Sequence, residues 1–372
     1  MKILIASTLK PVNDTRLYEK IALTLVSKGN HEVSIAGYSA STSESSAKKV
    51  KFYPLFKFER LSLQRLFAPL VIIRLTLRLK PDILLIATHE LLVAAFFLKI
   101  VSNQKVVYDI QENYAYNIRY MQTFPPIVRQ IVAFFVRCKE ILIAPLIDGF
   151  ILAENVYQRQ LTFIKDRYIV LPNKIRLVEN EILSLGLVNV SKPLHFLYTG
   201  SISKEYGIWQ AIAFIDKLEK IDKDVNLKIL GYTASKALHH QLKDELKDKK
   251  YIVADIRLAP VPYSEISAAQ KQGAILLLPY RPSKAIEGKI PTRLFEGMAR
   301  RLPMVIEGKL NLQFLTGPYN AAVYIDFAKF NAIELLNTIK SQVFYTANPE
   351  REVLWSFEEE KLLQWINKLD NA

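Results

Sequence analysis

The chain has 372 residues, of which half are hydrophobic and 23% charged, a composition that excludes an intrinsically disordered protein. That length is natural for two domains. Fifty Lys and Arg side chains against 36 Asp and Glu give a formal charge of +14, which favours anionic partners without choosing among nucleic acid, acidic lipid and phosphorylated substrates.

The sequence also limits the cellular setting. A single cysteine, Cys138, rules out an internal disulfide and fits a reducing compartment. The apolar run at the N-terminus is too short for a signal peptide. The nearest case of a membrane span, at 83–101, is interrupted by His89 and Glu90. We therefore expect a cytoplasmic protein without a membrane span.

The N-terminal half alternates between strand and helix patterns. Residues 2–6 and 31–37 are short apolar strands, and apolar residues recur at helical spacing between them. A strand, a helix and a strand in that order predict a parallel, doubly wound sheet. The loop at 8–14 has no glycine and so is not a dinucleotide-binding fingerprint. Asn13 or Asp14 in this loop could simply be the N-cap of the helix.

Two further strands are predicted at 83–87 and 105–109. His89 follows the first of them, and Glu112 follows the second. Ligands of parallel sheets collect beyond the carboxyl ends of the strands, so both are candidate site residues. A lone histidine is also commonly a structural hydrogen-bonding group, and both interpretations of His89 stay open.

Two segments of this half, 61–80 and 124–147, place Arg and Lys among apolar residues at helical spacing. Pro69 should kink or split the first. Cations on one side of a helix and aromatics on another are typical of helices that lie at a membrane interface. An amphipathic helix packed on a protein core has the same pattern. Peripheral membrane contact and ordinary packing therefore both stay open.

The C-terminal half repeats the alternation of strands and helices. Its first strand leads into Gly200 and Ser201, where a glycine lets a phosphate approach the backbone closely. Strands are predicted at 194–199, 226–231, 251–256, 273–278, 304–306 and 321–325, and helices at 208–218, 235–247, 264–270 and 357–369. Residues 39–49 are predicted as a loop and 176–193 as a linker. The chain then divides into an N-terminal domain (1–180), a second domain (190–350) and a C-terminal helical segment (351–372).

The stretch 286–305 contains the most informative pattern. Pro291 suits the first turn of a helix, and Glu296 stands early in that helix. The N–H groups at a helix start can bind a phosphate, and Lys289 and Arg293 flank them. Cations, a helix start and one carboxylate suit a nucleotide sugar, with its phosphates on the cations and its ribose hydroxyls on the acid. An ordinary loop and helix with solvated charges would have the same composition.

The segment Pro291, Arg293, Phe295 and Glu296 resembles the donor-binding signature of retaining glycosyltransferases of family 4. Many relatives have two glutamates separated by seven residues, whereas Glu287 and Glu296 are separated by eight. The opening Asn13-Asp14-x-Arg16 also resembles this family. Where the family has Tyr-Asp-x-His-Glu, this chain has Gln111 in place of the histidine. Where the family commonly has two cations after the first strand of its second domain, this chain has Ser201 and Tyr206.

The resemblance implies the GT-B fold: two Rossmann-like α/β domains that face each other across a cleft, with a terminal helix that crosses back to the first domain. It implies transfer of a sugar, with retention, from a UDP- or GDP-type sugar to an acceptor hydroxyl. The acceptor would be a glycan or lipid-linked, in cell-surface polysaccharide or glycolipid synthesis at the inner face of the membrane. It implies no metal and no cofactor beyond the nucleotide sugar.

The same resemblance and the residue patterns together give the predicted site. The residues expected nearest the chemistry are His89, Glu287 and Arg293. The residues expected to bind the donor are Gly200, Ser201, Lys204, Gly231, Gly288, Lys289, Pro291, Thr292, Arg293 and Glu296. The residues expected on the acceptor side are Asn13, Asp14, Arg16 and Glu112.

Two other functions remain compatible with the sequence. A nucleotide-sugar epimerase of the same fold would use the donor without an acceptor. A degenerate protein of this fold would bind a membrane or a partner subunit, and Ser201, Tyr206 and Gln111 favour it. Nucleic-acid binding is not expected, because the cations are scattered rather than grouped around exposed aromatics.

Overall fold

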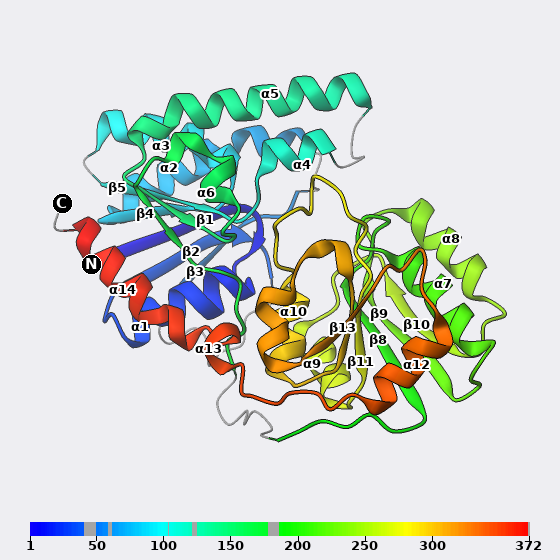
Figure 1. Cartoon of the computed structure of the whole chain (residues 1–372). Coiled ribbons are helices and arrows are strands. Elements are labelled where there is room, and N and C mark those ends of the chain that lie inside the picture. Colours follow the sequence, from blue (N-terminus) through cyan, green and yellow to red (C-terminus); the bar gives the residue numbers. More distant parts are fainter. Residues whose placement is uncertain (41–49, 59–61, 103, 121–124, 178–185, 371–372) are drawn as a thin grey trace. The chain divides into compact units, whose positions relative to one another are not determined.

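A computed structural model describes residues 1–40, 50–58, 62–102, 104–120, 125–177 and 186–370 (Figure 1). The chain forms two compact units. Unit 1 comprises Met1–Arg176 with Trp355–Ala372, and unit 2 comprises Leu177–Leu354. Most of the predicted loop at 39–49, the centre of the predicted linker at 176–193 and the first residue of each basic segment lie outside the described residues.

Unit 1 is built on a seven-stranded sheet in the order β3-β2-β1-β4-β5-β6-β7, with every pairing parallel. The strands are β1 (Lys2–Pro11), β2 (Glu32–Tyr38), β3 (Val50–Phe56), β4 (Ile83–Ile86), β5 (Lys105–Ile110), β6 (Gly149–Leu152) and β7 (Tyr168–Val170). Strands β4 and β6 are buried at every position, because helices cover both faces of the sheet.

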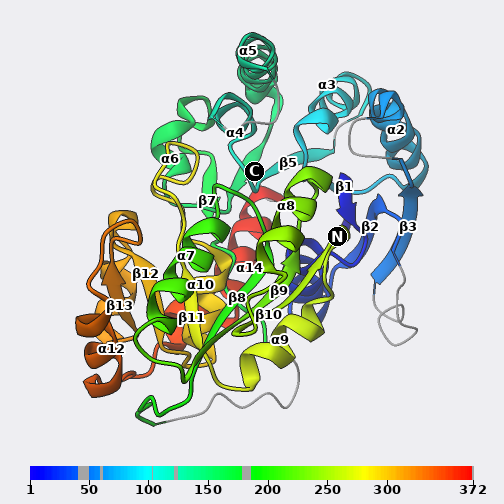
Figure 2. The same cartoon turned by 90° about the vertical axis from the view of Figure 1, so that its right-hand side faces the viewer.

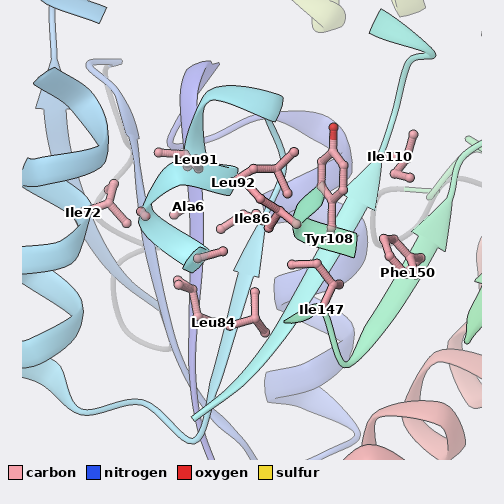
Figure 3. Close-up of a cluster of buried hydrophobic side chains, with 14 of the residues drawn as sticks. Ala6, Ile72, Leu84, Ile86, Leu91, Leu92, Tyr108, Ile110, Ile147 and Phe150 are labelled. Atoms are coloured by element: carbon pink, nitrogen blue, oxygen red, sulfur yellow. The ribbon is translucent and has the colours of Figure 1, made fainter. Parts of the chain in front are cut away.

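Alternate residues of these strands serve two cores. One core joins Leu84 of β4 and Tyr108 of β5 to the helices α2, α3 and α5 (Figure 3). The other joins Ile3 and Ile5 of β1 to the N-terminal helices and to Leu362 of α14. The helical elements of unit 1 are a π-helix (Thr15–Ala22), α1 (Leu23–Ser27), α2 (Ala68–Leu79), α3 (Leu92–Val101), α4 (Tyr114–Tyr120), α5 (Pro126–Ile143), α6 (Tyr157–Gln160) and α14 (Ser356–Asp370), with 3-10 turns at Leu63–Phe67, His89–Leu91, Ala144–Leu146 and Thr162–Ile164.

Unit 2 has a six-stranded sheet in the order β10-β9-β8-β11-β12-β13, again with every pairing parallel. Its strands are β8 (Leu194–Ser201), β9 (Val225–Tyr232), β10 (Ile252–Arg257), β11 (Ile275–Leu278), β12 (Met304–Glu307) and β13 (Ala322–Ile325). Its helices are α7 (Ile208–Glu219), α8 (Lys236–Leu246), α9 (Tyr263–Lys271), α10 (Thr292–Ala299), α11 (Gln313–Thr316), α12 (Ala332–Ser341) and α13 (Glu350–Val353). The prediction of parallel, doubly wound sheets is confirmed.

The helical segment predicted over 61–80 is split near Pro69, as the sequence indicated. A 3-10 turn at Leu63–Phe67 precedes α2, and Pro69 lies in the first turn of that helix. A proline there removes no helical hydrogen bond, so the break falls before it. Strand β3 and helix α12 were not predicted from the sequence. No helix among the described residues is long and apolar enough to cross a membrane.

Two glycines allow a close approach at the carboxyl edge of the unit 2 sheet. Gly207 has a φ of +77°, and a Cβ there would lie 1.7 Å from the carbonyl oxygen of Pro279. A Cβ at Gly231 would lie 2.1 Å from the carbonyl oxygen of Gly200. Side chains at these positions would force the strand ends apart. The backbone segments at this edge, which carries predicted donor-binding residues, are therefore packed directly against one another.

Candidate functional site

Arg293, in the first turn of α10, is the central charged group at the carboxyl edge of the unit 2 sheet. Its side chain is buried, with 7% of its surface exposed. The guanidinium carbon lies 4.8, 5.9 and 5.7 Å from the ring centres of Tyr198, Tyr206 and Tyr280. These are cation–π distances, and the rings replace part of the hydration that burial removes.

The same guanidinium lies directly behind the turn that follows β8. Nη2 of Arg293 donates a hydrogen bond to the carbonyl oxygen of Ser201. A Cβ at Gly200, whose φ is +84°, would lie 3.1 Å from Nε of Arg293. Nη1 of Arg293 is buried and has no hydrogen-bond acceptor among the described residues. The structure therefore holds a buried positive charge with unused hydrogen-bonding capacity beside the predicted phosphate-binding turn.

This arrangement bears on the two positions where the family resemblance calls for cations. Ser201 and Tyr206 stand there, and both contact Arg293, the first through its carbonyl and the second through its ring. The positive charge at this turn thus comes from α10. Lys204, in the same turn, is exposed.

Glu296 lies one helical turn further along α10 and is half-buried. Its Oε2 accepts a hydrogen bond of 3.0 Å from Nε2 of Gln270 on α9, a side chain that is fully buried. A hydrogen bond from a fully buried amide limits the rotamers of the carboxylate. Glu296 is therefore held in place while part of its surface stays accessible.

The loop before α10 borders a cavity of about 430 Å³, a size that suits a small ligand. Glu287, Gly288, Leu312 and Phe314 are among the residues that line it. Pro291 is the N-cap of α10 and offers no side-chain acceptor to the first turn. Its carbonyl accepts from the N–H of Leu294 at 2.9 Å, so the N–H groups of Thr292 and Arg293 are the ones that a ligand or solvent can meet. Thr292 is exposed and Lys289 is half-buried.

A larger cavity of about 780 Å³ lies elsewhere in unit 2. It is lined by His195 at the start of β8, Ile275 at the start of β11 and Pro303 before β12. These residues mark the amino ends of the strands. Parallel sheets bind ligands at the opposite, carboxyl end, so position rather than volume identifies the smaller cavity as the candidate site.

In unit 1, Arg16 and Asp109 form a buried ion pair at the carboxyl edge of the sheet. Nη2 and Nε of Arg16 donate to the carboxylate at 2.8 and 3.0 Å, and Asp109 is fully buried. Nη1 of Arg16 donates to the carbonyl of Leu171 and to Asn173. Gln111 donates to Asp109 at 2.9 Å. Arg16 is thus engaged within the protein, and it ties the π-helix that follows β1 to β5 and to the segment that follows β7.

The other predicted acceptor-side residues lie near this pair. Asp14 is the N-cap of the π-helix and accepts from the N–H groups of Arg16 and Leu17 at 3.0 Å. The N-cap interpretation of this loop is therefore correct for Asp14. Asn13 precedes it and is half-buried. Glu112 is exposed and accepts from Nδ2 of Asn117 on α4 at 3.0 Å.

His89 follows β4 and is enclosed by helices α4 and α5. Nζ of Lys139 lies 3.0 Å from Nδ1 of His89, and the Tyr114 ring centre lies 4.8 Å from the imidazole. An ammonium can only donate, so Nδ1 accepts and the proton of the neutral ring is on Nε2. Glu90, beside it, is paired with Arg65. His89 is therefore a neutral group with its proton on Nε2, and Nε2 lies 3.6 Å from Oε1 of Glu90.

The charge state of His89 gives a testable pH dependence. Burial, with the charges of Lys139 and Arg65, lowers the pKa of His89 to about 3. The unfolded chain takes up a proton first as the pH falls, so this group's contribution to stability is fully present above about pH 6.5 and is lost toward pH 3. The imidazole resonances of His89 should not titrate between pH 8 and about 4 in NMR spectra. Lys139→Met should raise the pKa of His89. The His89 resonance is assigned by its absence from the spectrum of His89→Asn. If that resonance titrated near pH 6.5 in the wild type, the expectation would be contradicted.

Several residues of these clusters were not predicted from the sequence: Tyr198, Gln270, Tyr280 and Lys139. Tyr198 stands two residues before Gly200, and Tyr280 follows β11, so both occupy carboxyl ends of strands. That position could have marked both tyrosines as candidate site residues. Gln270 and Lys139 lie on helices, where the sequence contains no comparable indication. Among the described residues, no group of three or more His, Cys, Asp or Glu side chains could hold a metal ion.

No protein-family model matches this chain, and no curated protein matches it. Solved structures do match over its whole length. Sucrose-phosphate synthase from Thermosynechococcus elongatus has a TM-score of 0.64 at 11% identity and covers 100% of this chain and 96% of its own. HepE from Anabaena, in complex with UDP, has a TM-score of 0.62 at 13% identity over 99% and 100%.

A third similar structure is the UDP-GlcNAc 2-epimerase from Methanocaldococcus jannaschii, in complex with UDP-GlcNAc and UDP. Its TM-score is 0.57 at 13% identity, over 99% of this chain and 100% of that one. Identities this low establish the fold, and they confirm the predicted GT-B architecture of two Rossmann-like α/β units. Membership of family 4 stays a prediction.

Proposed function

We propose that this chain is a glycosyltransferase that moves a sugar from a nucleoside diphosphate of the UDP or GDP type to an acceptor hydroxyl, with retention. The observation that carries the proposal is Arg293: a buried guanidinium that forms no ion pair with a carboxylate of the described residues, behind the Gly200–Ser201 end of β8. A buried cation is costly unless an anion pairs with it, and a diphosphate would be that anion. UDP complexes among the similar folds support this choice.

The donor would bind to the second domain, residues 190–350. Its reaction is limited by cleavage of the anomeric bond, so stabilising the departing diphosphate is the main task of the protein. We assign that task to Arg293 and the start of α10, with Lys289 and Lys204 at its margin. Glu296, already oriented by Gln270, would accept hydrogen bonds from the ribose hydroxyls. Glu287 and Gly288, on the 430 Å³ cavity, would lie beside the sugar.

The acceptor would bind to the first domain, residues 1–180, which we group with the C-terminal helix from 351 to 372. His89, held neutral by burial and Lys139, would donate through Nε2 to a sugar hydroxyl rather than exchange protons. Asn13 and Glu112 would meet the acceptor directly, whereas Asp14 and Arg16 would act by holding the loop.

Glu296→Gln tests the ribose contact. Losing the negative charge should weaken binding of the nucleoside diphosphate by about tenfold to a hundredfold, because a hydrogen bond to a charged group is worth about 1.5–3 kcal/mol. Binding of the parent nucleoside should weaken by the same factor, since the contact involves the ribose alone. Isothermal calorimetry would measure both. Glu265→Gln, a half-buried acid on α9 that pairs with Arg257, is the control for loss of a carboxylate elsewhere in unit 2, and equal affinities in both variants would remove the assignment.

The donor itself can be found by thermal shift, because a ligand that binds only the folded state raises its melting temperature. UDP- and GDP-sugars are the probes, followed by a turnover assay. A nucleotide-sugar epimerase is the second candidate, favoured by the similar epimerase structure. It would convert the donor at full rate without an acceptor, whereas a transferase would only hydrolyse it slowly. Failure of every nucleotide to bind would instead support a degenerate binding protein.

A further inference from the structure

The exposed apolar side chains of the described chain are concentrated on one part of unit 1. Of 27 exposed large hydrophobic residues, 18 lie on the 3-10 turn Leu63–Phe67 and the helices α2, α3 and α5. They include Phe96, Phe97, Phe134 and Phe135, which are exposed by 41 to 66%. Single exposed apolar residues are ordinary on a protein surface, but a concentration of this size marks a binding surface.

These elements form one layer. Helix α2 packs on α3, α3 packs on α5, and all three contribute to the core on the same face of the seven-stranded sheet (Figures 1 and 2). Each helix therefore has an inward apolar side, formed by residues such as Ile72, Leu92 and Ile143, and a second apolar side that faces away from the core. We call this outer side the α2–α3–α5 face. The sequence left core packing and membrane contact open as alternatives for 61–80 and 124–147. The structure leaves room for both, because the core contacts use one side of each helix and the other side is exposed.

The charges of the α2–α3–α5 face are almost all of one sign. Its elements carry Arg65, Arg74, Arg78, Lys99, Arg129, Arg137 and Lys139. Arg65 pairs with Glu90 and Lys99 with Asp148, two acids outside these elements, and Lys139 contacts His89. The only acidic residue of these elements is Glu140, which is 2% exposed and paired with Arg137. Arg74 and Arg78 are exposed, and Lys80 follows them at the end of α2. The solvent side of this layer therefore has apolar residues and cations but no exposed carboxylate.

We propose that the α2–α3–α5 face docks on the surface of an anionic lipid bilayer. Aromatic and aliphatic side chains would enter the headgroup boundary while the arginines and lysines contact acidic headgroups. A second copy of this chain fits the face poorly, because self-pairing would bring two surfaces of the same positive sign together. The helices would lie along the bilayer, since none of those described is suited to cross it.

Helix α3 extends the membrane contact expected from the sequence. Its exposed side consists of Val93, Phe96, Phe97, Ile100 and Val101, and no acidic residue interrupts it. It lies between the two segments, 61–80 and 124–147, that the charge pattern had indicated. The three together make a broad surface, and a broad apolar surface with several cations is what reversible binding to a bilayer requires.

The test is flotation of the full chain with vesicles of phosphatidylcholine, with or without phosphatidylglycerol. The wild type should bind the anionic vesicles at least about tenfold more tightly, and added salt should weaken that binding. Phe134→Ser/Phe135→Ser and Phe96→Ser/Phe97→Ser should each reduce binding at least about tenfold. Arg74→Glu/Arg78→Glu should abolish the preference for the anionic vesicles.

The matched control is Phe357→Ser/Leu258→Ser, which removes two equally exposed apolar residues outside the face and should bind like the wild type. Circular dichroism verifies that each variant is folded. Failure of the wild type to float, or equal binding by the Phe134/Phe135 variant, would overturn the proposal. Concentration-dependent dimers without vesicle binding, lost in the same variant, would replace the lipid surface with a second copy. None of these results depends on nucleotide binding, so the proposed transferase function is judged separately.

Discussion

Asp109→Ala is expected to lower the free energy of unfolding of unit 1 by about 3–5 kcal/mol, the usual loss when one member of a buried ion pair is removed. Asp109 is fully buried and accepts three hydrogen bonds of 2.8–3.2 Å from Arg16. Without the carboxylate, the Arg16 guanidinium would remain buried with a full charge. Its remaining acceptors, Leu171 and Asn173, carry no charge to balance it.

Urea unfolding followed by circular dichroism would measure this loss. Arg16→Met/Asp109→Leu is the informative companion, because replacing both charges with apolar groups should recover much of the stability. Glu32→Ala, which breaks the exposed pair with Lys51, should leave the unfolding midpoint nearly unchanged. If Asp109→Ala resembled Glu32→Ala, the ion pair would have no structural role. Arg16 would then become a candidate for direct contact with the acceptor.

The features of the fold that repeat locally were predictable from the sequence. The apolar runs at β1, β4 and β5 and the helical spacing between them follow from burial on both faces of a sheet. Strand β3 was not predictable in the same way. Its pattern VKFYPLF alternates poorly, includes Pro54 and exposes several positions, as an edge strand can. Its identity comes from its parallel pairing with β2, a contact that no local pattern contains.

In the candidate site, too, the local features were predictable from the sequence and the long-range contacts were not. Pro291 and Glu296 could be named from spacing within a single helix start, and that spacing is local. The burial of Arg293 could not, because it depends on tyrosines that reach it from β8 and from the end of β11. Sequence spacing indicated a cation that would meet a phosphate at the helix start. The structure shows a buried cation behind the backbone at the end of β8. This difference changes which substitution of Arg293 tests the proposed phosphate contact.

Arg293→Met is therefore the sharpest test of the proposed function. We expect affinity for the nucleoside diphosphate to fall by about tenfold to a hundredfold, since a charged hydrogen bond contributes about 1.5–3 kcal/mol. Stability should stay the same or increase, because methionine has a similar volume and removes a buried cation that has no carboxylate partner in the described part of the chain. Alanine would be less informative, because it would also leave a cavity between Tyr198 and Tyr280.

Calorimetry with the nucleoside and with its diphosphate separates the roles of Arg293 and Glu296. Arg293→Met should weaken binding of the diphosphate and leave binding of the nucleoside unchanged, whereas Glu296→Gln should weaken binding of both. Thermal unfolding of the same samples supplies the second readout. If Arg293→Met melted at a markedly lower temperature and bound the diphosphate like the wild type, Arg293 would serve only to hold the Ser201 carbonyl and the three rings. If Arg293→Met instead keeps its stability and loses only affinity for the diphosphate, the buried charge stabilises the complex with the diphosphate and not the ligand-free fold.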